Sequence, residues 1–157
     1  MRAALVCILG LFASVAGATR YGDVQRAVSD DVMLQNAGLS PADAQIRKQC
    51  SAALLQTDDP PEFFDCVYVQ TEKDLNLFSL EDGYLMSELQ LKLHNMDGVA
   101  LQHMGRYSQV QIFSGDHVTA LYIHGKSWID PAQTADVYQW LIAHGVQKRQ
   151  PRKWIGP

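Results

Sequence analysis

Two histidines near the end of a predicted hairpin, His117 and His124, are the strongest candidates for acid–base chemistry in this sequence. Asp116 directly precedes the first of them, and Asp130 follows the second after a short segment. A neutral imidazole close to a carboxylate can act as the general base of a hydrolase. These four side chains therefore support one hypothesis, a small hydrolase that uses His124 or His117 with Asp116 or Asp130.

A sequence resemblance bears on the same region. Residues 121–125 end a predicted strand in a His-Gly pair, and they precede a predicted helix that ends in a second His-Gly pair. This arrangement resembles the oxyanion-forming element of the α/β hydrolases. Those enzymes carry their nucleophilic serine in a G-x-S-x-G turn, and the chain has no such motif. We therefore assign no catalytic residue, and the hydrolase remains an alternative.

Metal and cofactor sites are not expected. His94 and His103 would lie diagonally across a predicted hairpin, but Lys92 falls between them and would repel a cation. Zinc needs three or four ligands, which this pair does not supply. The chain also lacks the H-E-x-x-H motif, the phosphate-binding glycine loop and the dinucleotide fingerprint.

The first 18 residues have the three-part layout of a secretory signal peptide. Arg2 precedes an apolar run over residues 3–15, and the small residues at 16–18 suit a signal peptidase. The run is shorter than the roughly 20 residues that span a bilayer. We expect cleavage after Ala18, a secreted or periplasmic product, and no transmembrane segment in the remaining chain. Removing Arg2 would make the net charge of −4 one unit more negative.

Export also changes the cysteine chemistry, because Cys7 lies in the predicted signal peptide. Cys50 and Cys66 then remain, and an oxidising compartment favours a bond between them. A redox pair would need closer spacing, and a metal site would need further ligands. The sequence therefore predicts one structural disulfide, Cys50–Cys66.

Apolar residues at helical spacing dominate the first half of the predicted mature chain. They predict three helices, over residues 23–36, over residues 40–56, and a short one from residue 60. Ser40-Pro41 has the pattern of an N-cap followed by a first helical residue. The disulfide between Cys50 and Cys66 would then join the second and third helices across a helical hairpin.

Alternation of apolar and polar residues replaces this pattern in the second half. It predicts two antiparallel hairpins, with strands over residues 89–93, 99–104, 107–113 and 117–123. The Asp97-Gly98 pair indicates the first turn, and a three-residue loop at 114–116 would place Ile112 opposite Val118. Residues 71–82 fit neither period.

A last helix is predicted over residues 131–144, with Asp130-Pro131 as its cap and Gly145 as its stop. The predicted fold class is therefore α+β. It consists of an N-terminal helical hairpin stapled by one disulfide, an antiparallel sheet of about four strands and a C-terminal helix. We expect a single domain over residues 19–146 and a basic tail over residues 147–157.

Aromatic and basic side chains concentrate in the last third of the chain, and such residues are favoured in protein interfaces. The tail carries four basic residues on an otherwise acidic chain. We expect it to dock on the protein's own surface, or else to contact an anionic partner such as a phospholipid surface. The candidate binding residues are Tyr122, His124, Trp128, Arg152, Lys153 and Trp154.

These features favour a small exported binding protein, for example an inhibitor or an immunity-type partner of a secreted enzyme. The expected partner is another protein rather than nucleic acid, because nucleic-acid binders normally carry a basic excess. The exported hydrolase and an envelope or secretion-assembly subunit are the alternatives.

Overall fold

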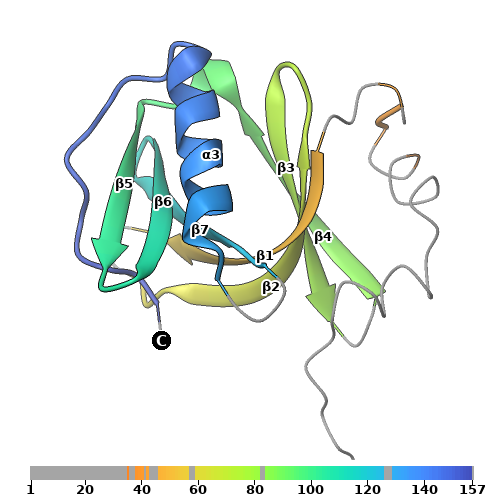
Figure 1. Ribbon diagram of the computed structural model, residues 1–157. Helices are drawn as coiled ribbons and strands as arrows, with labels where there is room; N and C mark the ends of the chain where they lie inside the picture. The colour runs from red at the N-terminus through yellow and green to blue at the C-terminus, as the bar shows by residue number, and fades with distance from the viewer. Residues whose placement is uncertain are drawn as a thin grey trace, which may run out of the picture.

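The computed structural model describes Gln35, residues 38–40, Ala42, and residues 46–56, 59–81, 84–125 and 129–156. These residues form one curled antiparallel sheet and one helix, α3 (Pro131–Ala143). Its strands are β1 (Ile46–Leu55), β2 (Glu62–Gln70), β3 (Asp74–Glu81), β4 (Tyr84–Lys92), β5 (Gly98–Met104), β6 (Tyr107–Ser114) and β7 (His117–Ile123), with a 3-10 turn at Leu93–Asn95. The strand order is β4-β3-β2-β1-β7-β6-β5, and α3 lies inside the curl (Figure 1).

The predicted α+β fold with an N-terminal helical hairpin is wrong, because the segments assigned to that hairpin are strands β1 and β2. The protein is mostly β. Both faces of these strands are covered, as the burial of neighbouring Ala52 and Ala53 shows. A strand buried on both sides loses the alternation that identifies a strand, and its apolar residues can match helical spacing by coincidence.

The cap pattern at residue 40 forms a turn instead of starting a long helix. The Ser40 hydroxyl accepts a hydrogen bond from the Ala42 N–H at 3.2 Å, as an N-cap would, yet the chain is in strand β1 from Ile46. Of the helix predicted over residues 23–36, only Gln35 is among the described residues. The predicted signal peptide also lies outside them.

The hairpin predicted around Asp97-Gly98 does not form, because β4 pairs with β3 and β5 pairs with β6. Residues 71–82, which had no assignment, supply β3. Asp97 instead holds a different turn: its backbone N–H donates to the Phe113 carbonyl, and its carboxylate accepts from the Gly115 N–H. The Asp97-Gly98 pair, which is a typical turn sequence, therefore forms a contact with the β6–β7 turn instead of a hairpin turn of its own.

The second predicted hairpin, β6–β7, is confirmed, but its register differs by one residue. Its loop has two residues, with Gly115 at a φ of +60° and Ser114 opposite His117. Ile112 therefore faces Thr119 rather than Val118. Because side chains alternate between faces, this shift moves Val118 to the opposite side of the sheet from Ile112.

The C-terminal helix is confirmed as α3. The Asp130 carboxylate accepts hydrogen bonds from the N–H groups of Ala132 and Gln133, both at 3.0 Å. Gly145 follows the helix with a φ of +87°, a conformation that favours glycine. The helix buries Thr134, Val137 and Leu141.

The sheet carries an apolar cluster on each face. We call the side packed on α3 the inner face, and its buried residues include Tyr68, Leu75, Leu77, Ile112, Leu121 and Ile123. We call the other side the outer face, and its cluster consists of Ala53, Ala100, Phe113, Val118, Ala120 and Ile155. Ile155 belongs to the C-terminal segment, which therefore contributes to the core.

Residues 147–156, which we call the tail, run past the edge strand β5 and end against the sheet, where Ile155 is buried (Figure 1). The Val99 N–H donates to the Gln147 carbonyl at 2.8 Å, and the Arg149 N–H donates back to Val99 at 2.9 Å. The guanidinium groups of Arg149 and Arg152 lie 5.5 and 5.9 Å from the centre of the Phe113 ring. The tail thus docks on its own protein, through backbone and ring contacts.

Two fully buried glutamines of β6 hold the end of the tail. The Gln111 side chain accepts from the Arg152 N–H at 2.8 Å and donates to the Lys153 carbonyl at 3.2 Å. The Gln109 side chain binds both the N–H and the carbonyl of Ile155. Buried amides need such partners, so the tail backbone and the glutamines satisfy one another.

The predicted disulfide is present, although it joins two strands rather than two helices. Cys50 and Cys66 lie directly opposite each other in β1 and β2, with Cα atoms 4.9 Å apart, and both are fully buried on the inner face. The bond closes a loop with a sequence separation of 16.

Replacing both cysteines, in the variant Cys50→Ala/Cys66→Ala, should lower the free energy of unfolding by about 3 kcal/mol, the chain-entropy value for a loop of this length. Chemical denaturation of the oxidised protein and of the variant measures the difference. Wild type with its disulfide reduced is the matched control and should unfold close to the variant. Equal stability of variant and oxidised wild type would show that the bond contributes nothing.

The variant Gln109→Leu should loosen the tail, because each lost buried hydrogen bond costs about 1 kcal/mol or more and leaves tail groups without partners. We expect trypsin to cut after Arg149 or Arg152 at least about tenfold faster, since cleavage follows local opening. Gln139→Leu, at an exposed position of α3, is the control, and trypsin should cleave this variant at the wild-type rate. Unchanged cleavage in Gln109→Leu would contradict the role given to this glutamine.

Candidate functional site

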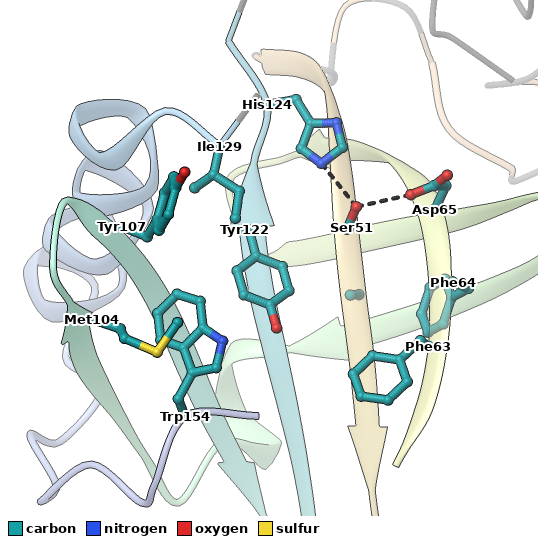
Figure 2. Close-up of a pocket in the computed structure, with 11 residues that line it drawn as sticks. Ser51, Phe63, Phe64, Asp65, Met104, Tyr107, Tyr122, His124, Ile129 and Trp154 are labelled. Carbon is teal, nitrogen blue, oxygen red and sulfur yellow. Dashed lines mark hydrogen bonds between the residues drawn. The ribbon is translucent and has the colours of Figure 1, made fainter. Parts of the chain in front are cut away.

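A pocket of about 390 Å³ opens on the outer face, where β1, β2 and β7 meet the end of the tail (Figure 2). It is mostly apolar, with a small polar group at one end formed by Ser51, Asp65 and His124. The lining residues are Ser51, Ala52, Phe63, Phe64, Asp65, Met104, Tyr107, Tyr122, His124, Ile129 and Trp154.

Strand register brings the polar group together. Ser51 in β1 is paired with Asp65 in β2 on one side and with Tyr122 in β7 on the other. Paired residues of neighbouring strands point to the same face, so the three side chains stand side by side. His124 lies two residues beyond Tyr122 on the same face, and its backbone N–H donates to the Gln49 carbonyl at 2.9 Å.

The Ser51 hydroxyl is at the centre of this group. Its Oγ donates to Asp65 Oδ1 at 2.8 Å, and it lies 2.8 Å from His124 Nε2 (Figure 2). A carboxylate can only accept, and a hydroxyl has one proton. With that proton directed to Asp65, the Ser51 oxygen accepts from His124, which places a proton on Nε2. The order along the chain of hydrogen bonds is therefore His124, Ser51, Asp65.

Burial lowers the pKa of His124 below its ordinary value of 6.5, and the negative charge of Asp65 opposes this shift only in part. The imidazole is therefore neutral at pH 7. Asp65 is then the charged member of the polar group.

Tyr122 and Trp154 form the wall of the pocket on the side of the tail, to which Trp154 belongs. The Tyr122 hydroxyl donates to the Ile155 carbonyl, and the two rings lie 5.4 Å apart between centres. Burial raises the pKa of Tyr122 to about 12, against a lowering effect of its hydrogen bond with Gln109. Tyr122 thus stays protonated and keeps donating to the tail.

The rim of the pocket is apolar and open. Phe63 is 48% exposed and Met104 is 47% exposed, and they are the large apolar side chains with most exposure in the described part of the chain. Figure 2 shows them on opposite sides of the opening, with Tyr107 beside Met104. Exposed apolar residues gathered at a hollow are typical of a binding site rather than of an inert surface.

The structure brings three of the predicted binding residues into this pocket: Tyr122, His124 and Trp154. Trp128 lies outside the described residues. Arg152 and Lys153 are exposed on the tail and do not line the pocket, although their carbonyl groups accept from Gln111.

The four acid–base residues proposed from the sequence do not form one group, because two lie at one end of β7 and two at the other. His117 and Asp116 lie at the β6–β7 turn, at the opposite end of β7 from His124, a separation of roughly 20 Å at the usual rise per residue. The Asp130 carboxylate caps α3. The Nδ1 atom of His103 lies 3.0 Å from the Ser108 hydroxyl oxygen. Among the described residues, no cluster of three or more His, Cys, Asp or Glu side chains could hold a metal ion.

Ser51 and Asp65 were missed by the sequence analysis because their segments were assigned to helices. One signal could have found them. If Cys50 and Cys66 face each other in antiparallel strands, then Ser51 and Asp65, the next residues along β1 and back along β2, must be opposite as well.

A second hollow, of about 440 Å³, lies at the other end of β1. Its lining includes Leu54, Glu62, Lys92, His117 and Thr119. It has no Phe, Tyr or Trp among its lining residues. Within the described residues, no helix is long and apolar enough to span a membrane.

No protein-family model matches the chain, and no curated protein matches it. Among solved structures it is similar to the hSac2 domain from the human phosphoinositide phosphatase Sac2, with 13% sequence identity and a TM-score of 0.43. The similarity covers 89% of this chain and 97% of that one. We draw no conclusion about function from a similarity at this level.

The lowered pKa of His124 predicts a pH dependence of stability. As the pH falls below about 6.5, His124 takes up a proton in the unfolded chain before it does so in the folded protein. The neutral, buried imidazole therefore contributes its full stabilisation above that pH. This stabilisation is lost as the pH falls through the lowered pKa of His124 in the folded protein. Between about pH 7.5 and 5, the free energy of unfolding should therefore fall more steeply for wild type than for His124→Gln. The same series on His117→Gln, an exposed site, is the control and should follow wild type. Parallel curves for wild type and His124→Gln would refute the assignment.

Proposed function

We propose that this protein is a small exported binding protein and that the pocket around Ser51, Tyr122 and Trp154 is its ligand site. The observation that supports this proposal most strongly is the pocket itself. It combines an apolar, aromatic lining with one polar group at its end, the composition typical of small-molecule sites. Its volume falls within the usual range for such sites, roughly 300–1,000 Å³.

The case for export rests on the signal-peptide pattern of residues 1–18 and on the disulfide. Disulfides persist in oxidising compartments and are rare in the cytosol. The inhibitor and immunity-type roles, and an envelope-assembly role, would need a protein partner, for which the exposed apolar side chains of Phe63 and Met104 are one available contact. We place the primary contact in the pocket, because the polar group lies there.

A second candidate function is hydrolysis with Ser51 as nucleophile. The observation in its favour is the 2.8 Å distance between Ser51 Oγ and His124 Nε2. In the Ser-His-Asp arrangement, however, the imidazole accepts the serine proton and the carboxylate orients the imidazole. Here the Ser51 hydroxyl donates its hydrogen bond to the Asp65 carboxylate instead of to the imidazole, so His124 is not placed to act as the base. The arrangement therefore favours binding over catalysis.

The binding proposal predicts saturable 1:1 uptake of Nile red, a neutral dye that fluoresces in apolar surroundings. The variant Phe63→Ser/Met104→Ser should weaken this uptake at least about tenfold, because it removes two apolar side chains from the rim and each contributes roughly 1–2 kcal/mol when buried by a ligand. Leu54→Ser, in the second hollow, is the matched control and should bind like wild type. Absence of saturable binding would overturn the proposal.

The same preparation separates the two candidate functions. A fluorophosphonate probe reacts with activated serines, and we expect it to leave the protein unlabelled. Labelling at Ser51 that disappears in Ser51→Ala, together with turnover of a simple ester, would replace binding by hydrolysis as the function. Nile red binding without labelling supports the binding protein.

A further inference from the structure

We infer that the pocket selects a small organic cation, an alkyl- or arylammonium ion whose charged end meets Asp65 and whose apolar body lies against the surrounding rings. This inference rests on the proposed function of the pocket as a ligand site and adds the chemical class of the ligand.

The lining carries one charge of a single sign. Among its described residues, Asp65 is the acidic side chain, and no Lys or Arg lines the pocket. His124 is neutral at pH 7, because burial lowers its pKa. The Ser51 hydroxyl satisfies one carboxylate oxygen of Asp65 but brings no positive charge. The pocket therefore presents a half-buried anion whose charge is not balanced within the lining.

The rings add to the same preference. Phe63, Tyr107, Tyr122 and Trp154 surround the hollow, and the faces of aromatic rings are negative (Figure 2). An ammonium ion near such faces gains about 0.5–2 kcal/mol for a ring, with tryptophan the most favourable. Carboxylate and rings therefore act in the same direction on a cation.

The other ligand classes are disfavoured by the same groups. An anionic ligand would meet the Asp65 charge and the negative ring faces. A neutral apolar ligand would remove water from the carboxylate without replacing its hydrogen bonds, and burying an unpaired charge is costly. An ammonium ion replaces that water with N–H donors and a compensating charge, which gives charge-assisted hydrogen bonds.

The arrangement of the pocket also orients the ligand. Asp65 and Ser51 lie at the polar end, whereas Phe63 and Met104 form the rim with about half of each side chain exposed. The charged end of the ligand therefore lies at the polar end of the pocket, and its apolar body contacts the rim. The occupant we assign is a free small molecule, because the hollow is a pocket of limited volume lined on several sides.

The test compares three ligands of similar size on the full oxidised protein, by displacement of Nile red: 2-phenylethylammonium, 2-phenylethanol and phenylacetate. We expect the ammonium ion to bind at least about tenfold more tightly than the alcohol, and phenylacetate to bind most weakly. In Asp65→Asn the ratio of ammonium to alcohol affinity should fall to near one. Asparagine keeps an acceptor for the Ser51 hydroxyl, and thermal unfolding checks that the variant is folded.

Two further variants sharpen the result. Asp74→Asn removes a half-buried carboxylate outside the pocket and should keep the wild-type ratio. Tyr107→Leu keeps an apolar rim but removes one ring, and should weaken the ammonium ion more than the alcohol.

The failure of this inference differs from the failure of the proposed function. If Nile red binds but the alcohol binds as tightly as the ammonium ion, or if Asp65→Asn keeps the wild-type ratio, the cation preference is wrong and the ligand site stands. If neither Nile red nor, in a direct calorimetric titration, 2-phenylethylammonium binds, both are wrong. If a lysine-containing peptide binds more tightly than 2-phenylethylammonium, the occupant is a protein side chain, and the assignment to a small molecule is overturned.

Discussion

The position of β1 at the centre of the sheet is the constraint on which the rest of the structure depends. β1 pairs with β2 on one side and with β7 on the other, and at the level of Cys50 and Ser51 it is paired with both strands. Cys50 faces inward at that level and is bonded to Cys66 beneath α3. Ser51, the next residue, faces outward between Asp65 and Tyr122. A slip of one residue would exchange these faces, removing the disulfide from the core and the hydroxyl from the pocket.

The tail is the second support of the site, and it is held mainly through its backbone. The side chains of Gln109 and Gln111 bind the tail through its backbone, whereas its basic side chains remain largely exposed. Buried amides tolerate few alternative partners, so their demand for hydrogen bonds fixes the path of the tail. That path places Trp154 against Tyr122 and closes one wall of the pocket. The core glutamines of one strand thus determine the shape of a site formed by others.

The features that could be predicted from the sequence were those determined locally. Asp130, Pro131 and Gly145 mark the ends of α3 through their own backbone preferences, and Gly115 marks a turn between two alternating strands. The disulfide followed from counting cysteines after the predicted signal peptide. The features that could not be predicted depend on distant segments. β1 and β2 look helical because both of their faces are covered, and Asp97 serves the β6–β7 turn rather than a hairpin of its own. Tyr122, His124 and Trp154 were found from their residue types, whereas Ser51 and Asp65 acquire their meaning only once the strands are paired.

From the strand order we expect the pairs of strands to form at different times during folding. β1 and β2 are neighbours along the chain, so their pairing closes a short loop at little entropic cost. The pairing of β1 with β7 joins residues that lie between about 60 and 75 positions apart along the chain, from Leu55–Val118 to Cys50–Ile123, and such non-local contacts form slowly. Oxidation of Cys50 and Cys66 within the β1–β2 hairpin would hold β1 in register with β2 before β7 pairs with it. Before β7 pairs with it, one edge of β1 has unpaired backbone groups, and we expect the chain to aggregate most readily at this stage.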